Sequence, residues 1–171
     1  MIQDYIRRHI IVLAFGLLAL SCKDGPTEPT QVDVEQIQYI VLKYQFDQPA
    51  FDDPNSRYKA YYIGLAISDS MHRFHSVSDP SPALVKRFIN NIPPVKKYSD
   101  GHFIDTGYYD DTTGERGVIF HVAQITWTST STGELDSGEY FGGLGADRFR
   151  FYVSRNERVW SVDSLHWVGS S

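Results

Sequence analysis

His121 is the side chain of this sequence best placed to do chemistry inside a folded domain. It lies in an alternating run from Ile119 to Trp127 whose other members on its face are apolar. A histidine on such a face can serve as an acid, a base or a ligand contact, and we predict a pocket formed by His121, Trp127 and Tyr140. The alternative is a core histidine that is hydrogen-bonded inside the protein. The sequence favours this second interpretation.

Metal-binding patterns are incomplete in this chain. His72 and His75 are spaced so that a helix would place both on one face of a metal site, but their segment lacks helical periodicity. The run 110–114 supplies carboxylates, yet it lacks the alternating ligands and terminal glutamate of a calcium loop. A turn with Gly114 at positive φ explains this run better. We therefore predict no metal, no cofactor and no catalytic residue.

The first 22 residues have the order of a secretory signal. Arg7 and Arg8 precede an apolar run, 10–20, which is shorter than the roughly 20 residues of a membrane-spanning helix. Small residues and the only cysteine, Cys22, follow. This ending resembles the lipobox of bacterial lipoproteins, with Ala19 where such boxes usually carry leucine. The resemblance implies that Cys22 is diacylated and anchors an extracytoplasmic protein, with the outer membrane as the expected location.

Three segments follow from this interpretation: a lipoprotein signal peptide (1–21), a flexible proline-containing tether (22–31) and a single globular domain (32–171). The whole chain has a net charge of −5. Lysines and arginines form no cluster, which argues against nucleic acid as a partner. If Cys22 is lipidated, the mature protein has no free thiol, so disulfides and cysteine-based zinc sites are excluded.

Two helices are expected. Residues 33–46 fit a helix and a strand, and we choose the helix because Asp33 and Gln36 resemble a capping box at its start. A shorter helix begins after a cap at Asp79 or Ser81. Its apolar positions recur every four residues: Leu84, Phe88 and Ile92.

The rest of the chain predicts strands and loops. A strand is expected over 58–68, and a mostly irregular segment over 95–115. After Gly117 we expect a continuous antiparallel meander whose last strand, 159–168, shifts phase at a bulge. Together these elements predict an α+β fold in which one or two helices pack on a curved antiparallel sheet of about five strands, a cystatin-like or nuclear-transport-factor-like cone.

Several sequence blocks carry a resemblance. They are the stretch from Thr113 to Val122, the stretch from Gly138 to Leu144, and the ending from Trp160 to Val168. In this order they resemble a group of small secreted proteins and lipoproteins, commonest in Bacteroidota and related bacteria, that have no assigned activity. The resemblance implies one extracytoplasmic domain and supplies no catalytic residue. The polar pair Asp136-Ser137 departs from the more hydrophobic approach expected before Gly138.

We therefore expect a lipid-anchored cell-envelope domain that binds or scaffolds a protein, peptide or glycan without catalysis. The alternative is a small-molecule-binding protein or enzyme with a pocket around His121. A cavity lined by His121 and a carboxylate would favour the alternative. A sheet whose inner side is filled by the helix 33–46 would favour binding at the outer surface.

Overall fold

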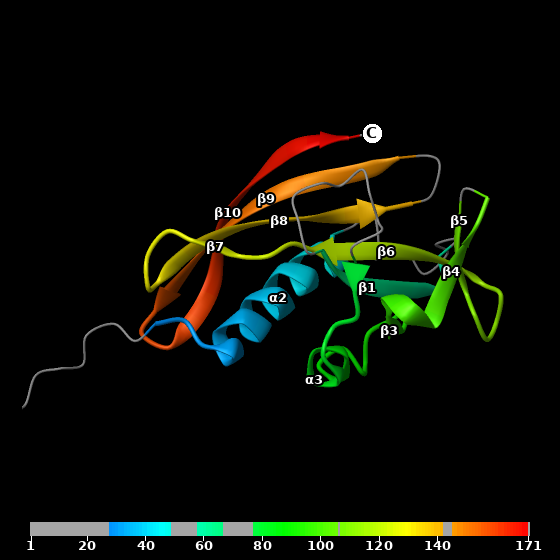
Figure 1. The fold of residues 1–171 in the computed structure, drawn as a ribbon, viewed down its shortest axis with the longest axis horizontal. Coiled ribbons are helices and arrows are strands. Elements are labelled where there is room, and N and C mark those ends of the chain that lie inside the picture. The colour runs from blue at the N-terminus through cyan, green and yellow to red at the C-terminus, as the bar shows by residue number, and fades with distance from the viewer. Residues whose placement is uncertain (1–27, 49–57, 67–76, 106, 142–144, 171) are drawn as a thin grey trace, which may run out of the picture.

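The computed structural model describes residues 28–48, 58–66, 77–105, 107–141 and 145–170 (Figure 1). The predicted signal peptide, Cys22 and the pair His72 and His75 lie outside these residues, as does most of the predicted tether. The domain elements in chain order are α2 (Gln31–Phe46), β1 (Ala60–Ala66), β2 (Val77–Ser78), α3 (Pro82–Lys86), β3 (Val95–Lys97), the 3-10 helix η3 (Tyr98–Asp100), β4 (Gly101–Ile104), β5 (Gly107–Asp110), β6 (Arg116–Val122), β7 (Thr126–Trp127), β8 (Thr132–Tyr140), β9 (Ala146–Asn156) and β10 (Val159–Ser170).

These strands form one ten-stranded mixed sheet with the main order β10-β9-β8-β6-β1-β2. Strand β1 runs parallel to both β6 and β3, and the remaining pairs are antiparallel. The long strands β8, β9 and β10 pass over α2 (Figure 1), and Phe88, just after α3, packs against Tyr39 and Phe46 of α2. The predicted cone with an antiparallel sheet of about five strands is therefore wrong.

The error has a physical cause. Residues 95–115, expected to be mostly loop, contain the short elements β3, η3, β4 and β5. Each of these strands has three or four residues, too few to show a period, and β3 and β5 are paired to the longer strands β1 and β6. The parallel alignment of β1 with β6 brings together residues that the sequence separates by more than fifty positions, for example Tyr61 and Val118.

Helix α2 begins at a capping box three residues earlier than predicted, with Thr30 in the role expected of Asp33 and Asp33 in the role expected of Gln36. Thr30 is the N-cap, and its Oγ1 accepts a hydrogen bond from the Asp33 amide while the Asp33 carboxylate accepts one from the Thr30 amide. The buried side of the helix packs on the inner face of the sheet. The principal members of this core are Ile37, Val41, Leu42 and Phe46 of the helix, and Tyr61, Ile63, Val118, Phe120, Leu135, Phe151, Val153 and Trp160 of the strands.

A second, smaller core lies on the other face of the sheet. Tyr62 of β1, Ile119 of β6 and Tyr108 of β5 form it, and Tyr98 of η3 packs against them. The Tyr62 and Tyr108 rings meet edge to face at 4.8 Å between centroids. Strand β6 is thus buried on both faces, as expected from its apolar sequence.

The polar pair Asp136-Ser137 lies inside β8, where cross-strand partners satisfy it. Asp136 accepts hydrogen bonds from Arg150 on β9 at 2.8 and 3.2 Å. Ser137 Oγ donates to the His121 carbonyl at 2.6 Å and accepts from Gln45 Nε2 of α2 at 3.0 Å. These contacts explain how a strand can contain two polar residues without leaving them unpaired.

The hairpin β9–β10 confirms the predicted phase shift. Its register changes between Val162 and Ser164, which leaves Asp163 as the extra residue of a bulge. Asp163 accepts a hydrogen bond from Ser154 Oγ at 2.8 Å. The turn before β10 places Glu157 at a φ of 56°.

Candidate functional site

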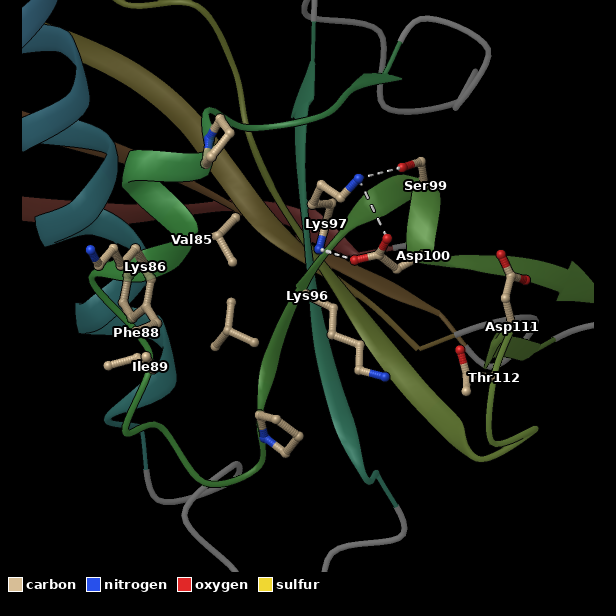
Figure 2. Close-up of a pocket in the computed structure, with 13 residues that line it drawn as sticks. Val85, Lys86, Phe88, Ile89, Lys96, Lys97, Ser99, Asp100, Asp111 and Thr112 are labelled. Atoms are coloured by element: carbon tan, nitrogen blue, oxygen red, sulfur yellow. Dashed lines mark hydrogen bonds and ion pairs between the residues drawn. The ribbon is translucent and has the colours of Figure 1, made fainter.

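An open groove of about 780 Å³ separates α3 from β3 and η3. Figure 2 shows the apolar side chains of α3 and the chain after it on one wall, and the lysines of β3 on the other. We call this feature the α3–β3 groove. Its lining residues are Pro82, Val85, Lys86, Phe88, Ile89, Pro94, Val95, Lys96, Lys97, Ser99, Asp100, Asp111 and Thr112.

The α3 wall is held by a cap and two buried side chains. Ser81 is the N-cap of α3, and its Oγ accepts a hydrogen bond from the Leu84 amide at 3.1 Å. Leu84 and Phe88 are buried in the main core. The helix ends at Lys86, so Ile92 does not continue its buried face as predicted and is 88% exposed. Ile89 is 75% exposed and forms part of the groove wall.

The opposite wall is fixed by ion pairs and hydrogen bonds. Asp79 accepts hydrogen bonds from the Ser99 amide at 2.8 Å and from Ser99 Oγ at 2.6 Å. The Lys97 ammonium lies 3.5 Å from Asp100 and 3.7 Å from Asp79 (Figure 2 draws the Asp100 contact). Burial raises the pKa of Asp79, but the bonds from Ser99 and the charge of Lys97 outweigh it, so the pKa stays below its usual value.

Lys96 joins the groove to the core behind it. Its ammonium pairs with the buried carboxylate of Asp110, which also accepts a hydrogen bond from the Tyr62 hydroxyl at 2.6 Å. The other Asp110 oxygen accepts from the amides of Thr112 and Thr113 at 3.0 and 2.8 Å, which forms the predicted turn, with Gly114 at a φ of 68°. Burial opposes ionisation of Asp110, yet these bonds hold its pKa well below the usual value.

This arrangement suits binding. The groove offers exposed aliphatic surface at Ile89, just after α3, and its lining includes Lys86 on one side and Lys96, which is paired with Asp110, on the other. Among the described residues that line it there is no cysteine or histidine, and Ser99, the one serine among them, is bonded to the carboxylate of Asp79. In the sequence, Lys86-Arg87 and Lys96-Lys97 were interpreted only as scattered surface charge. The signal that could have identified the groove was Ile89, an apolar residue just beyond a short helix whose buried positions are Leu84 and Phe88.

His121 and Tyr140 extend from the outer face of the sheet, and Trp127 lies on the inner face. His121 is 4% exposed, its cross-strand neighbours are Gly64 and Gly138, and neither ring nitrogen has a hydrogen-bond partner in the described structure. Burial lowers its pKa to about 4. The break after β6 returns Ile125 and Trp127 to the inner face, where Trp127 packs 5.6 Å from Trp160. The three residues therefore do not share one pocket, and none of them lines the groove.

The described ranges contain no group of three or more histidine, cysteine, aspartate or glutamate side chains suited to a metal ion. None of their helices is long and apolar enough to cross a membrane.

Fold and site together define a mixed-sheet domain with one long helix on its inner face and a groove at the α3 end. Comparison with known proteins finds no family model, no curated protein and no solved structure that matches the chain. The sequence resemblance to small secreted proteins and lipoproteins therefore stays a prediction.

Proposed function

We propose that this protein is a lipid-anchored binding domain of the cell envelope, and that its α3–β3 groove holds an extended peptide segment of a partner protein. The observation that carries the proposal is the exposed aliphatic side chain of Ile89 in a groove that Lys86 also lines. An exposed apolar surface with polar residues around it is typical of a protein interaction site. Helix α2 packs against the inner face of the sheet, and the groove lies beside α3.

The shape of the groove favours a peptide over a glycan or a small molecule. Among the described lining residues Phe88 is the one aromatic side chain, and it is buried and offers no ring face for a sugar. In the described part of the chain β3 pairs with β1 alone, so its other edge borders the groove (Figure 2). An extended peptide can add to such an edge through main-chain hydrogen bonds and place alternate side chains against the walls.

The charges of the lysines that line the groove indicate which peptide sequences would bind. Lys97 is already paired with two carboxylates, whereas no ion pair in the described residues involves Lys86. A carboxylate of the partner would therefore find its salt-bridge partner on the α3 wall, next to Val85 and Ile89. We expect a peptide with aliphatic side chains and at least one acidic residue.

Crosslinking in cells tests the groove. A photoreactive p-benzoylphenylalanine at position 89 should crosslink a partner protein, and Lys86→Glu in the same chain should weaken that crosslink several-fold. The control position is 159 on β10, where Val159 is also apolar and 63% exposed. Equal crosslinking from both positions, or none from position 89, would refute peptide binding in the groove.

The anchor rests on the sequence order of Arg7 and Arg8, the apolar run 10–20 and Cys22. Cys22→Ser should abolish labelling by a fatty-acid analogue and release the protein from the membrane fraction into the soluble extract. Ser21→Ala, which changes a neighbouring residue and keeps the thiol, should leave both unchanged. Lipid labelling of the Cys22→Ser protein would contradict the anchor.

A further inference from the structure

A second cavity, unrelated to the groove, lies between the C-terminal end of α2 and the strands β8, β9 and β10. Its volume is about 230 Å³, room for roughly seven groups of the size of a water molecule. We call it the α2 pocket. Its lining residues are Tyr44, Gln45, Gln48, Glu139, Phe149, Phe151 and Leu165.

The buried polar side chains of the α2 pocket, Gln45 and Glu139, present hydrogen-bond acceptors to it. Gln45 is 3% exposed, and its Nε2 donates to Ser137 while its buried Oε1 has no partner. The buried carboxyl of Glu139 takes part in no hydrogen bond or ion pair described for this domain. Gln48 is less buried than Gln45, and its Nε2 donates to the Tyr44 carbonyl at 3.0 Å. Buried acceptors without donors are unfavourable, so this site is complementary to a ligand that donates.

The charges around Glu139 also favour a ligand with a positive charge. The charged neighbour of Glu139 is another carboxylate, Asp147, with which it is paired in register across β8 and β9. Burial, with a smaller contribution from Asp147, raises the pKa of Glu139 to about 7. A cation placed in the pocket would offset both effects by favouring the ionised carboxylate.

The remaining walls are aromatic and aliphatic. Tyr44 and Phe151 meet edge to face with 5.7 Å between centroids, and Phe149 and Leu165 complete the lining. Aromatic faces attract organic cations and also pack against hydrocarbon. An apolar cavity with a carboxylate and an amide oxygen therefore combines the features that recognise an ammonium group and the carbon chain attached to it.

We propose that the α2 pocket is a binding site for a small organic ammonium ion, with Glu139 as its counter-ion and Gln45 Oε1 as a hydrogen-bond acceptor. The carbon chain of the ligand packs against Tyr44, Phe149 and Leu165. This site is separate from the peptide groove, and neither proposal depends on the other.

Calorimetric titration of the purified full-length chain in detergent tests the site with three matched probes: n-butylammonium, 1-butanol and butyrate. We expect saturable binding of n-butylammonium, with affinity that rises from pH 6 to pH 8 as Glu139 loses its proton to the buffer. Because hydrogen bonds to a charged group are strong, butanol should bind roughly tenfold or more weakly, and butyrate not at all. Equal affinity for butanol, preference for butyrate, or no saturable binding of the amine would overturn the proposal.

Variants locate the binding. Glu139→Gln keeps the shape of the side chain and should weaken n-butylammonium binding roughly 10- to 100-fold. Gln45→Met removes the unpaired oxygen and should weaken it several-fold. Glu134→Gln is the control, because it makes the same charge change on the same strand and does not line the pocket. A thermal melt establishes that each variant is folded, and undiminished affinity in folded Glu139→Gln would overturn the proposal.

Discussion

Replacing Asp33 tests how α2 is connected to the last hairpin of the sheet. Its carboxylate closes the capping box of α2 with Thr30 and accepts a hydrogen bond from Trp160 Nε1 of β10 at 2.7 Å. It also lies 3.3 Å from the Arg155 guanidinium of β9. One side chain therefore connects the start of the long helix to the last hairpin of the sheet, across more than 120 positions of sequence.

The expected cost of Asp33→Ala follows from these contacts. Loss of the capping interaction costs about 1 kcal/mol. The indole N–H of Trp160, a side chain of the main core, would lose its acceptor, which costs about 1–3 kcal/mol more. We expect a total loss of about 2–4 kcal/mol and a melting temperature lowered by roughly 5–15 °C.

Urea denaturation followed by tryptophan fluorescence measures this change, since Trp160 lies in the core. Asp47→Ala is the matched control: Asp47 is at the other end of α2, and its ion pair with Lys43 is exposed, so the cost should stay below about 0.5 kcal/mol. Equal small losses for both variants would refute the claim that Asp33 connects helix and sheet.

The same carboxylate predicts a pH dependence. Burial opposes its ionisation, but the bonds from Trp160 and Thr30 and the charge of Arg155 lower the pKa of Asp33 from 3.8 to about 2. A lowered pKa contributes stability that is complete above pH 3.8 and is lost as the pH falls through about 2. The stability difference between wild type and Asp33→Ala should therefore be constant from pH 7 to pH 5 and shrink below pH 4.

Two further variants test the buried outer face of the sheet. His121→Leu removes two buried nitrogens without partners. Because burial lowers the pKa of His121 from 6.5 to about 4, the free energy of unfolding of the wild type should fall as the pH drops from 6.5 towards 4, and that of the variant should change less. Equal pH dependence of the two proteins over this range would contradict the burial of a neutral imidazole. Gly138→Ala would place a Cβ 2.0 Å from the Asp147 carbonyl oxygen, so we expect a loss of about 2–3 kcal/mol in urea denaturation. Gly114→Ala, whose Cβ meets nothing within 4 Å, should cost only about 1 kcal/mol through its positive φ; a smaller loss at Gly138 than at Gly114 would show that β8 and β9 can separate at little cost.

The candidate sites show how far side-chain chemistry can be inferred without a fold. The alternation from Ile119 to Trp127 correctly placed His121 in a strand with apolar neighbours. It failed at the break after Val122, which reverses the face on which Ile125 and Trp127 lie. A period of two residues carries no information across such a break, so the predicted grouping of His121 with Trp127 was wrong.

Glu139 illustrates the opposite failure. Its sequence context, between Gly138 and Tyr140 in a predicted strand, gives no sign of a buried carboxyl. Only the packing of α2 against β8 and β9 encloses it beside Gln45 and Phe149. The groove likewise requires α3 and β3 to face each other, a relation between segments that no local pattern records.

Local chemistry was sufficient for the sequence to determine several elements. The apolar spacing of residues 33–46 specifies a helix, although its cap is Thr30 and not the predicted Asp33. Ser81 starts a second helix, and the alternation in 149–153 and the phase change near 163 specify a hairpin with a bulge. These features depend on contacts within a few residues, which the sequence contains. Tertiary structure alone decided the ten-stranded mixed sheet, the parallel pairing of β1 with β6 and both cavities. Those depend on which distant segments exchange backbone hydrogen bonds, and short strands such as β3 become strands only when a partner supplies those bonds.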